Sequence, residues 1–431
     1  MKVLSVLFER LLPPSGGGTP RTRALIDALR RRGHEVHVTC GSELEPQKTR
    51  ELLGVESHQP LLEVDRLDRN KMLKYLVCHP INIRRTVAHA RRVRPDVVVA
   101  HNAVAGLAAL EVRRRLPGVR FVLDLTDLLF DYLDAYADGN GRSRFWLGCM
   151  GKAGRLLEHK AIRQADRVIT MSEAMRTILI DLGAAANRTV VVPDGVDTGK
   201  FRPFRNDRLR ASISPWAESV VVFHGVVDPQ DEPLLLVDAA KAIVKDHPRT
   251  AFWVVGDGAA LLPMRRRVVQ SGLSRHFHFT GWVPASLVPR YVAAADLGLV
   301  ILPDARSARG RLTLKGFECW AVGIPVVLPD LPGLSEVVQH ADAARTYEPG
   351  KAASLAASVH ELLADRSLRR ELGERGLQMV GEHYAWDRLG EAMSVQIERA
   401  AAPRGGDAGA REAGREAALA GFAAAEGRSA Q

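Results

Sequence analysis

Hydrophobic positions occur in short β-branched runs, separated by stretches with helical periodicity. In the first half, runs typical of buried strands cover residues 2–8, 35–40, 95–101, 120–126, 166–172 and 189–197. A helical pattern covers residues 21–33, directly after a glycine-rich segment. Strands that alternate with helices of about 10–15 residues predict βαβ units and a parallel sheet. The first half therefore predicts one Rossmann-like α/β domain.

The same alternation starts again in the second half of the chain. A helix is expected over residues 233–248, and strands over residues 219–225, 250–258, 276–283, 295–302 and 324–329. We therefore expect an α/β fold with two doubly wound, parallel-sheet, Rossmann-like domains that face each other across a cleft. The predicted units are residues 1–205, residues 206–382, a helix over 383–400 and a disordered tail over 401–431.

Composition is that of a soluble protein. The chain has 431 residues, of which 46% are hydrophobic and 26% charged, close to the globular average. Its four cysteines form no CxxC pair, which indicates a reducing compartment. No apolar run reaches the roughly 18–20 residues that span a bilayer. A cytoplasmic protein is expected.

The net charge of +10 is concentrated in the first 200 residues, which hold 32 Lys and Arg against 23 Asp and Glu. One interpretation is peripheral contact with the anionic inner face of a membrane, or with an anionic acceptor. A solvated, arginine-rich helix surface is the simpler interpretation, and we favour it. Nucleic-acid binding is not expected, because no aromatic residues interleave the basic runs.

Two features near predicted strand ends are candidates for ligand binding. Gly16, Gly17 and Gly18 lie between the first strand and the first helix, where backbone amides and the helix N-terminus favour an anion; a plain tight turn is the alternative. His101 ends a strand, and such positions point into the cleft of this fold class. A structural histidine is the alternative there.

The segment TLKGFECWAVG places Lys315 and Glu318 on one helix whose other residues are mostly apolar. A carboxylate can accept hydrogen bonds from two ribose hydroxyls, and an ammonium at a helix N-terminus can hold a diphosphate. The alternative is an ordinary surface ion pair, worth about 0.2–0.5 kcal/mol. It fits poorly, because the flanking residues leave little polar face.

No paired-aspartate metal motif occurs, so no metal is expected. His276 and His278 share one face of a strand, but without a third ligand they are interpreted as packing. The GWVP segment, with Trp282 and Val283, opens a loop after a strand and could present backbone groups to a nucleotide base.

Taken in order, these motifs resemble the retaining glycosyltransferases of family 4, which have the GT-B fold. The resemblance covers about residues 1–400 and runs through VVVPDGVDTGKFRP, FHG, WVVGDGAAL, FTGWVPASLVPRYVAAADLGLVI, LTLKGFECWAVGIPVVLPDLPGLSEVV and WDRLGEAM. It implies that the first domain binds the acceptor, that the second binds the nucleotide sugar, and that the last helix crosses back to the first.

The resemblance also implies roles for individual residues. Gly16, Gly17 and Gly18 would lie near the donor diphosphate and His101, as the catalytic residue, beside the transferring sugar. Glu318 would bind the ribose, and Trp282 with Val283 the base.

This chain departs from the common family pattern at three places. Val226 and the pair Asp231-Glu232 replace an Arg and a Lys that contact the diphosphate, and Gly310 replaces a Glu that touches the sugar. We interpret Lys315 as the replacement diphosphate ligand. Arg309, Arg311 and Asp127 are weaker candidates for the same site.

The expected activity is metal-independent transfer of a hexosyl group from a nucleotide-diphosphate sugar to an acceptor hydroxyl, with retained configuration. The nucleotide sugar is a co-substrate, and no cofactor is expected. A catalytically idle binding or partner subunit and a nucleotide-sugar epimerase are the alternatives. The acceptor stays open between a lipid-linked molecule, a polysaccharide and a small natural product, as does the base.

Overall fold

The computed structural model describes residues 1–13, 18–62, 71–131, 141–204 and 206–402. The side chains of residues 71–77 and 141–150 are outside this description. Gly16 and Gly17 lie outside it as well, as does nearly all of the expected tail.

The first domain is a seven-stranded parallel sheet with the strand order β3-β2-β1-β4-β5-β6-β7. Its strands are β1 Lys2–Leu12, β2 Glu35–Ser42, β3 Ser57–Pro60, β4 Val97–His101, β5 Arg120–Asp124, β6 Arg167–Thr170 and β7 Thr189–Val191. Its helices are α1 Gly18–Arg31, α2 Pro46–Leu53, α3 Lys71–Val93, α4 Ala103–Arg115, α5 Gly141–Gln164 and α6 Glu173–Asp181. The sheet reverses order beside β1, which is the doubly wound topology.

The second domain repeats this plan with six parallel strands in the order β10-β9-β8-β11-β12-β13. They are β8 Ser219–His224, β9 Thr250–Val255, β10 Phe277–Gly281, β11 Leu297–Leu299, β12 Val326–Pro329 and β13 Ala344–Tyr347. Its helices are α7 Asp207–Ile213, α8 Leu234–Asp246, α9 Leu261–Gln270, α10 Val288–Val292, α11 Arg306–Arg309, α12 Leu314–Ala321, α13 Pro332–Ala341, α14 Ala352–Ala364 and α15 Arg366–His383. The predicted pair of Rossmann-like domains is confirmed.

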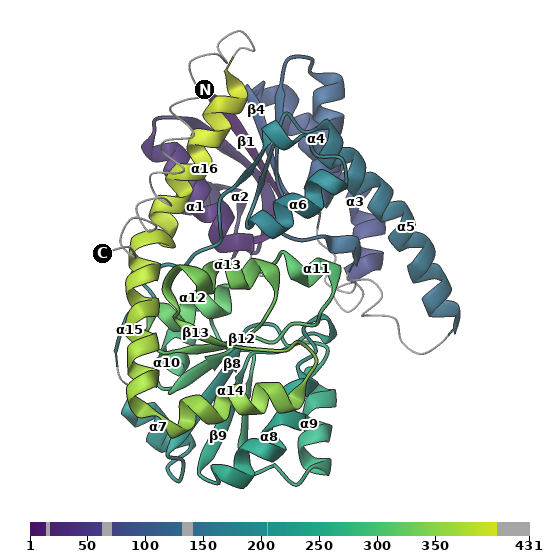
Figure 1. Ribbon diagram of the computed structural model, residues 1–431. Coiled ribbons are helices and arrows are strands. Elements are labelled where there is room, and N and C mark those ends of the chain that lie inside the picture. The colour runs from purple at the N-terminus through teal and green to yellow at the C-terminus, as the bar shows by residue number, and fades with distance from the viewer. Residues whose placement is uncertain (14–17, 63–70, 132–140, 205, 403–431) are drawn as a thin grey trace.

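Helix α16 (Trp386–Ala401) runs from the second domain along the first and packs against α1 (Figure 1). Its Leu389 and Met393 are buried in the same hydrophobic cluster as Leu25 of α1. A Cβ atom on Gly390 would lie 2.5 Å from the carbonyl oxygen of Ala24, so only glycine allows this close approach of the two helices. The C-terminal helix therefore completes the core of the N-terminal domain.

The two chain crossings between the domains are hydrogen-bonded to each other. The amide of Val196 donates to Tyr384 O at 2.9 Å, and the amide of Trp386 donates to Val196 O at 3.1 Å. A Cβ atom on Gly195 would lie 2.2 Å from Tyr384 O. This glycine lets the two crossing segments run side by side.

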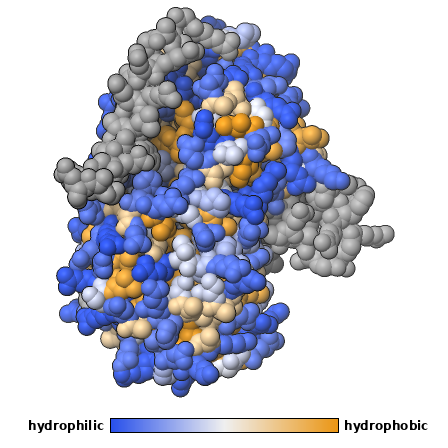
Figure 2. Space-filling model, in the orientation of Figure 1, coloured by the Kyte–Doolittle hydropathy of each residue, from blue (hydrophilic) through white to orange (hydrophobic). Residues whose placement is uncertain are grey.

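The visible face of the molecule is mostly hydrophilic, with hydrophobic residues in scattered groups on both domains (Figure 2). Within the described residues, no helix combines the length and apolarity that crossing a membrane requires.

Candidate functional site

Helix α12 begins where the two domains meet, and its packing directs its N-terminus toward the end of β8. Phe317, Cys319 and Trp320 are buried, and the indole of Trp320 donates to Ala343 O at 2.9 Å. A Cβ atom on Gly298 of β11 would lie 2.2 Å from Cys319 Sγ. Because the apolar side of the helix packs onto the sheet, Lys315 and Glu318 face the carboxyl end of β8 and the loop that follows it.

Lys315 and Arg311 converge on one buried carboxylate. Lys315 Nζ lies 2.9 Å from Asp231 Oδ2, and Arg311 Nη1 lies 3.2 Å from Asp231 Oδ1. Lys315 Nζ is also 4.6 Å from the centre of the Phe223 ring, a cation–π distance. The ordinary surface pairing of Lys315 with Glu318 is not the arrangement found. Lys315 instead belongs to a cluster of cations at the start of α12.

A neutral donor lies at the same helix end. Thr313 is the N-cap residue of α12 and 7% exposed, and its Oγ1 has no hydrogen-bond partner among the described residues. Buried hydroxyl groups are normally paired. A helix N-terminus, two cations and an unpaired hydroxyl together make a site suited to an anion.

Glu318 lies one turn further along α12 and is held by a histidine. Its Oε2 lies 2.7 Å from Nε2 of His224, the last residue of β8. The His224 side chain is buried, whereas that of Glu318 is 20% exposed. His224 thus fixes the position of this carboxylate at the carboxyl end of β8. It was not predicted as a site residue, although it stands in the FHG segment at a strand end.

The structure distinguishes the two weaker arginine candidates. Arg311 belongs to the cluster and also lies 3.2 Å from Asp127 Oδ1, which is in the first domain. Arg309 instead pairs with Asp304, and both side chains are more than half exposed. The structure thus brings Arg311, Asp127 and Lys315 together and leaves Arg309 on the surface.

Gly310, the residue at the family's glutamate position, is packed against the first domain. Ser172 Oγ donates to Gly310 O at 2.6 Å, and a Cβ atom on Gly310 would lie 2.7 Å from the Cα of Met175. Glu336 of α13 accepts hydrogen bonds from the amides of Glu173 and Ala174, at the N-terminus of α6. The backbone of α6 occupies the space that a side chain at position 310 would need.

The glycine loops that follow β8, β9 and β10 meet at one edge of the second sheet. A Cβ atom on Gly256 would lie 1.9 Å from Gly225 O, and Gly256 forms a bridge with Gly281. A Cβ atom on Gly225 would in turn lie 3.1 Å from Lys315 Cε. The next two residues after Gly281 are Trp282, which is 71% exposed, and Val283, which packs partly against the core. The predicted base-binding loop therefore lies on the same edge as Lys315.

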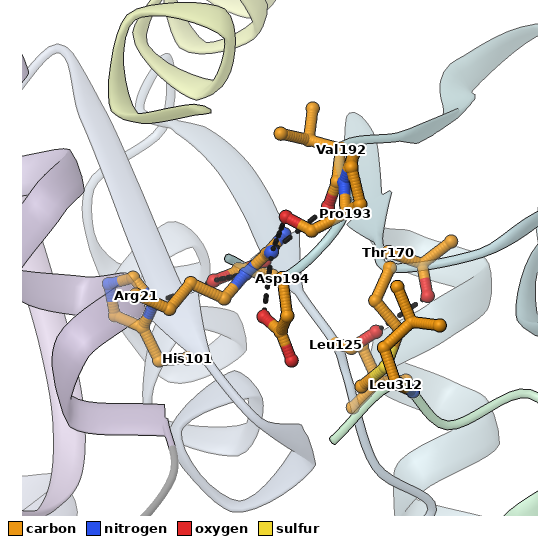
Figure 3. A network of polar contacts seen from close by, with 10 residues as sticks. Arg21, His101, Leu125, Thr170, Val192, Pro193, Asp194 and Leu312 are labelled. Carbon is orange, nitrogen blue, oxygen red and sulfur yellow. Dashed lines mark hydrogen bonds and ion pairs between the residues drawn. The ribbon is translucent and has the colours of Figure 1, made fainter. Parts of the chain in front are cut away.

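His101 lies in a buried polar network of the first domain (Figure 3). Its Nε2 lies 2.9 Å from Ser5 Oγ, and its Nδ1 lies 3.0 Å from Asp124 Oδ2. His101 is 4% exposed. Both ring nitrogens are thus engaged within the protein, and the predicted role beside the sugar stays a prediction.

Arg21 of α1 organises this network and was not predicted from the sequence. Its Nε donates to Asp124 Oδ1 at 2.9 Å, and its Nη1 donates to Val192 O at 2.9 Å and lies 3.1 Å from Asp194 Oδ1. Burial alone would raise the pKa of Asp124, but the charge of Arg21 and the contact with His101 lower it to about 2. Burial raises the pKa of Asp194 to about 6, although Arg21 opposes this. Arg21 and Asp124 form a buried ion pair.

Gly18, the last residue of the predicted glycine loop, begins α1. Among the described residues, no atom beyond its chain neighbours and its own helix backbone lies within 4 Å of a Cβ built on it. In the described part of the chain, no group of three or more His, Cys, Asp and Glu residues could hold a metal ion.

Two family models match this chain, one in each domain. Residues 16–195 match the glycosyl transferase 4-like domain, and residues 218–365 match the glycosyl transferases group 1 model. Each domain of the chain is thus similar to a glycosyl transferase model: a glycosyl transferase 4-like domain comes first and a group 1 domain second, in the GT-B arrangement.

Curated relatives are less than 30% identical to this chain. A D-inositol 3-phosphate glycosyltransferase of Geodermatophilus obscurus is 29% identical over 57% of this chain and 55% of its own length, so the chain spans about half of that relative. A GDP-mannose-dependent alpha-(1-6)-phosphatidylinositol monomannoside mannosyltransferase of Mycobacterium tuberculosis is 27% identical over 68% of this chain and 73% of its own length.

Solved structures share the fold. Sucrose-phosphate synthase from Thermosynechococcus elongatus superposes with a TM-score of 0.73 at 17% identity, covering 92% of this chain and 98% of the other. HepE from Anabaena, in complex with UDP-glucose, superposes with a TM-score of 0.71 at 17% identity, covering 93% of this chain and 100% of the other.

Proposed function

We propose that this protein is a glycosyltransferase that moves a hexosyl group from a nucleotide-diphosphate sugar to an acceptor hydroxyl, with retention and without a metal ion. The observation that carries the proposal is the arrangement on α12. Lys315 and Arg311 converge at its N-terminus beside the unpaired hydroxyl of Thr313, and Glu318 lies one turn further on.

Each part of this site fits one part of the donor. The two cations and the helix N-terminus can hold the diphosphate and stabilise the charge that develops on it as the glycosidic bond breaks. Glu318, oriented by His224, can accept hydrogen bonds from the ribose hydroxyls. Trp282 is exposed on the same edge and can stack on the base.

The proposed acceptor side is the first domain. Its Asp127 contacts Arg311 directly, so an acceptor bound there would lie close to the donor site. A lipid-linked acceptor is compatible with a face of α5 on which Lys152, Leu156, Leu157 and Lys160 are exposed. Cosedimentation with anionic and neutral vesicles tests this membrane contact, and binding to neither contradicts it.

A thermal-shift panel with UDP, GDP, dTDP and ADP tests the donor site. We expect one nucleotide to raise the melting temperature, and Glu318→Ala to remove the shift by weakening binding by about 1.5–3 kcal/mol. Glu374→Ala, at an exposed glutamate of α15 paired with Arg370, is the matched control and should keep the full shift.

Turnover separates the proposal from its alternatives. Transfer of sugar to added acceptors, equal in magnesium and in EDTA, and with the anomeric configuration retained, supports it in full. Nucleotide binding without turnover would indicate an idle partner subunit. Isomerisation of the donor sugar without acceptor would indicate an epimerase.

A further inference from the structure

Asp231 lies between the two cations that we assign to the diphosphate. One carboxylate oxygen is 2.9 Å from Lys315 Nζ and the other is 3.2 Å from Arg311 Nη1. The Asp231 side chain is 5% exposed, and those of the two cations are 13% and 15% exposed. Because water is largely excluded, these charges interact more strongly than a surface pair would.

The backbone holds Asp231 in this place. It ends a short 3₁₀ turn, Pro229–Asp231, in the loop that follows β8, and its amide donates to Asp228 O at 3.1 Å. Glu232 follows in the left-handed conformation, with φ of 48°, and Pro233 comes next. The carboxylate is therefore on a short side chain in a constrained turn, whereas Lys315 and Arg311 reach it with long, flexible side chains.

The charges of the cluster cancel. Burial alone would raise the pKa of Asp231, but Lys315 and Arg311 lower it below its ordinary value, so the group is ionised at neutral pH. Asp127, which lies 3.2 Å from Arg311, adds a second negative charge. Two cations thus face two carboxylates. A diphosphate that binds here is attracted by the cations and repelled by the carboxylates.

We propose that Asp231 is an internal counter-ion that competes with the donor diphosphate for Lys315 and Arg311 and so limits the affinity of the site for nucleoside diphosphates. This inference rests on the proposed function and goes beyond it by assigning an affinity-setting residue. Its consequence is faster release of the nucleoside diphosphate product, because a weaker hold on the diphosphate shortens the lifetime of the product complex.

The position of Asp231 in the family pattern supports the counter-ion role. It occupies the place at which the family resemblance leads one to expect a lysine. A carboxylate at that place lowers the net positive charge of the site. The positive charge comes instead from Arg311, just before α12, and from Lys315 within it.

Asp231→Asn is the decisive variant, because it keeps the shape of the side chain and removes only its charge. Titration calorimetry with UDP, GDP, inorganic pyrophosphate and uridine measures the effect. We expect the dissociation constants of the diphosphate probes to fall by on the order of tenfold, as removal of one nearby charge in a partly buried site implies. Uridine, which has no phosphate, should show no gain.

Glu232→Gln is the matched control. It removes the same charge from the next residue, which is exposed to solvent, so screening should leave the affinity nearly unchanged. In the double variant Asp231→Asn with Lys315→Met the tightening should largely disappear, because one of the two released cations is gone. Asp231→Ala should give the same direction if the Asn variant does not fold.

The outcomes separate the inference from the proposed function. Wild-type protein that binds UDP or GDP while Asp231→Asn binds it equally or more weakly overturns the counter-ion role alone. An equal gain in Glu232→Gln overturns it too. If neither wild-type protein nor the Asp231→Asn variant binds any diphosphate probe, both proposals fail. A variant that binds where wild-type protein does not supports both.

Discussion

Gly310 of the second domain lies against Met175 of the first, so closely that a Cβ atom on Gly310 would be 2.7 Å from the Cα of Met175. That separation is well inside van der Waals contact. Gly310 has φ of −97°, which any residue adopts, so the glycine is needed for the domain contact and not for the backbone conformation. At the position of the family glutamate, the backbone of α6 therefore leaves no room for a side chain.

Gly310→Ala is expected to destabilise the protein by about 1–3 kcal/mol, as overpacking of a tight contact does. Denaturant unfolding measures this change in the free energy of unfolding. Gly381→Ala is the control, because in the described part of the chain nothing outside its own helix backbone lies within 4 Å of its Cβ position in α15, and helix propensity there favours alanine. If both variants are equally stable, the packing argument is wrong.

Arg311 and Arg309 are predicted to differ in their effect on nucleotide binding. Arg311→Gln should weaken binding of a nucleoside diphosphate by about tenfold, because it removes a charged partner of the phosphates. Arg309→Gln should change the affinity less than twofold, since Arg309 pairs with Asp304 on the surface. Calorimetric titration of both variants checks the prediction, and the opposite ranking would remove Arg311 from the site.

His224 is predicted to act on the nucleotide only through Glu318. His224→Gln should raise the dissociation constant of the nucleotide by about fivefold, the loss of one oriented hydrogen bond. In the Glu318→Ala background the same change should have little further effect, because the residues act as one pair. Additive losses in the double variant would show that His224 contributes separately.

The buried pair of Arg21 and Asp124 is predicted to be essential for folding of the first domain. Asp124→Asn leaves a buried guanidinium without its full counter-charge, and we expect a loss of about 3–5 kcal/mol in unfolding free energy. Arg23→Gln, which removes a partly exposed arginine of the same helix, should cost less than about 1 kcal/mol. A stable Asp124→Asn protein would contradict the prediction.

Acidic pH is predicted to destabilise the protein through His89. This side chain is 2% exposed and bonded with Ser57 and Thr39, and burial lowers its pKa from 6.5 to about 4. The unfolded chain then binds the proton more readily, so stability falls as the pH falls from about 6.5 to 4. Linkage predicts a loss on the order of 1–2 kcal/mol at pH 5.

Urea midpoints at pH 7.5 and pH 5 measure that loss. His89→Gln retains hydrogen-bonding capacity and cannot titrate, so its loss between the two pH values should be smaller than that of the wild-type protein. Equal losses would assign the acid sensitivity to other groups.

Hydrophobic periodicity located most strands of both sheets but missed one edge strand of each. The strands β3 (Ser57–Pro60) and β13 (Ala344–Tyr347) contain the segments SHQP and ARTY, which have no apolar run. At an edge of a sheet, a strand is held by backbone pairing with one neighbour and needs less burial. For these strands the tertiary partner decides the structure.

The sequence by itself determined the order of strands and helices and placed Lys315 and Glu318 on one helix, because local periodicity and loop chemistry are short-range properties. It did not show that Lys315 would face Asp231, that Glu318 would face His224, or that Arg311 would reach Asp127. These pairs join segments far apart in the chain. The first two meet because parallel strands bring their carboxyl ends to one edge of the second sheet, and the third meets because the two domains pack against each other. Tertiary structure alone therefore decided the charge balance of the candidate site.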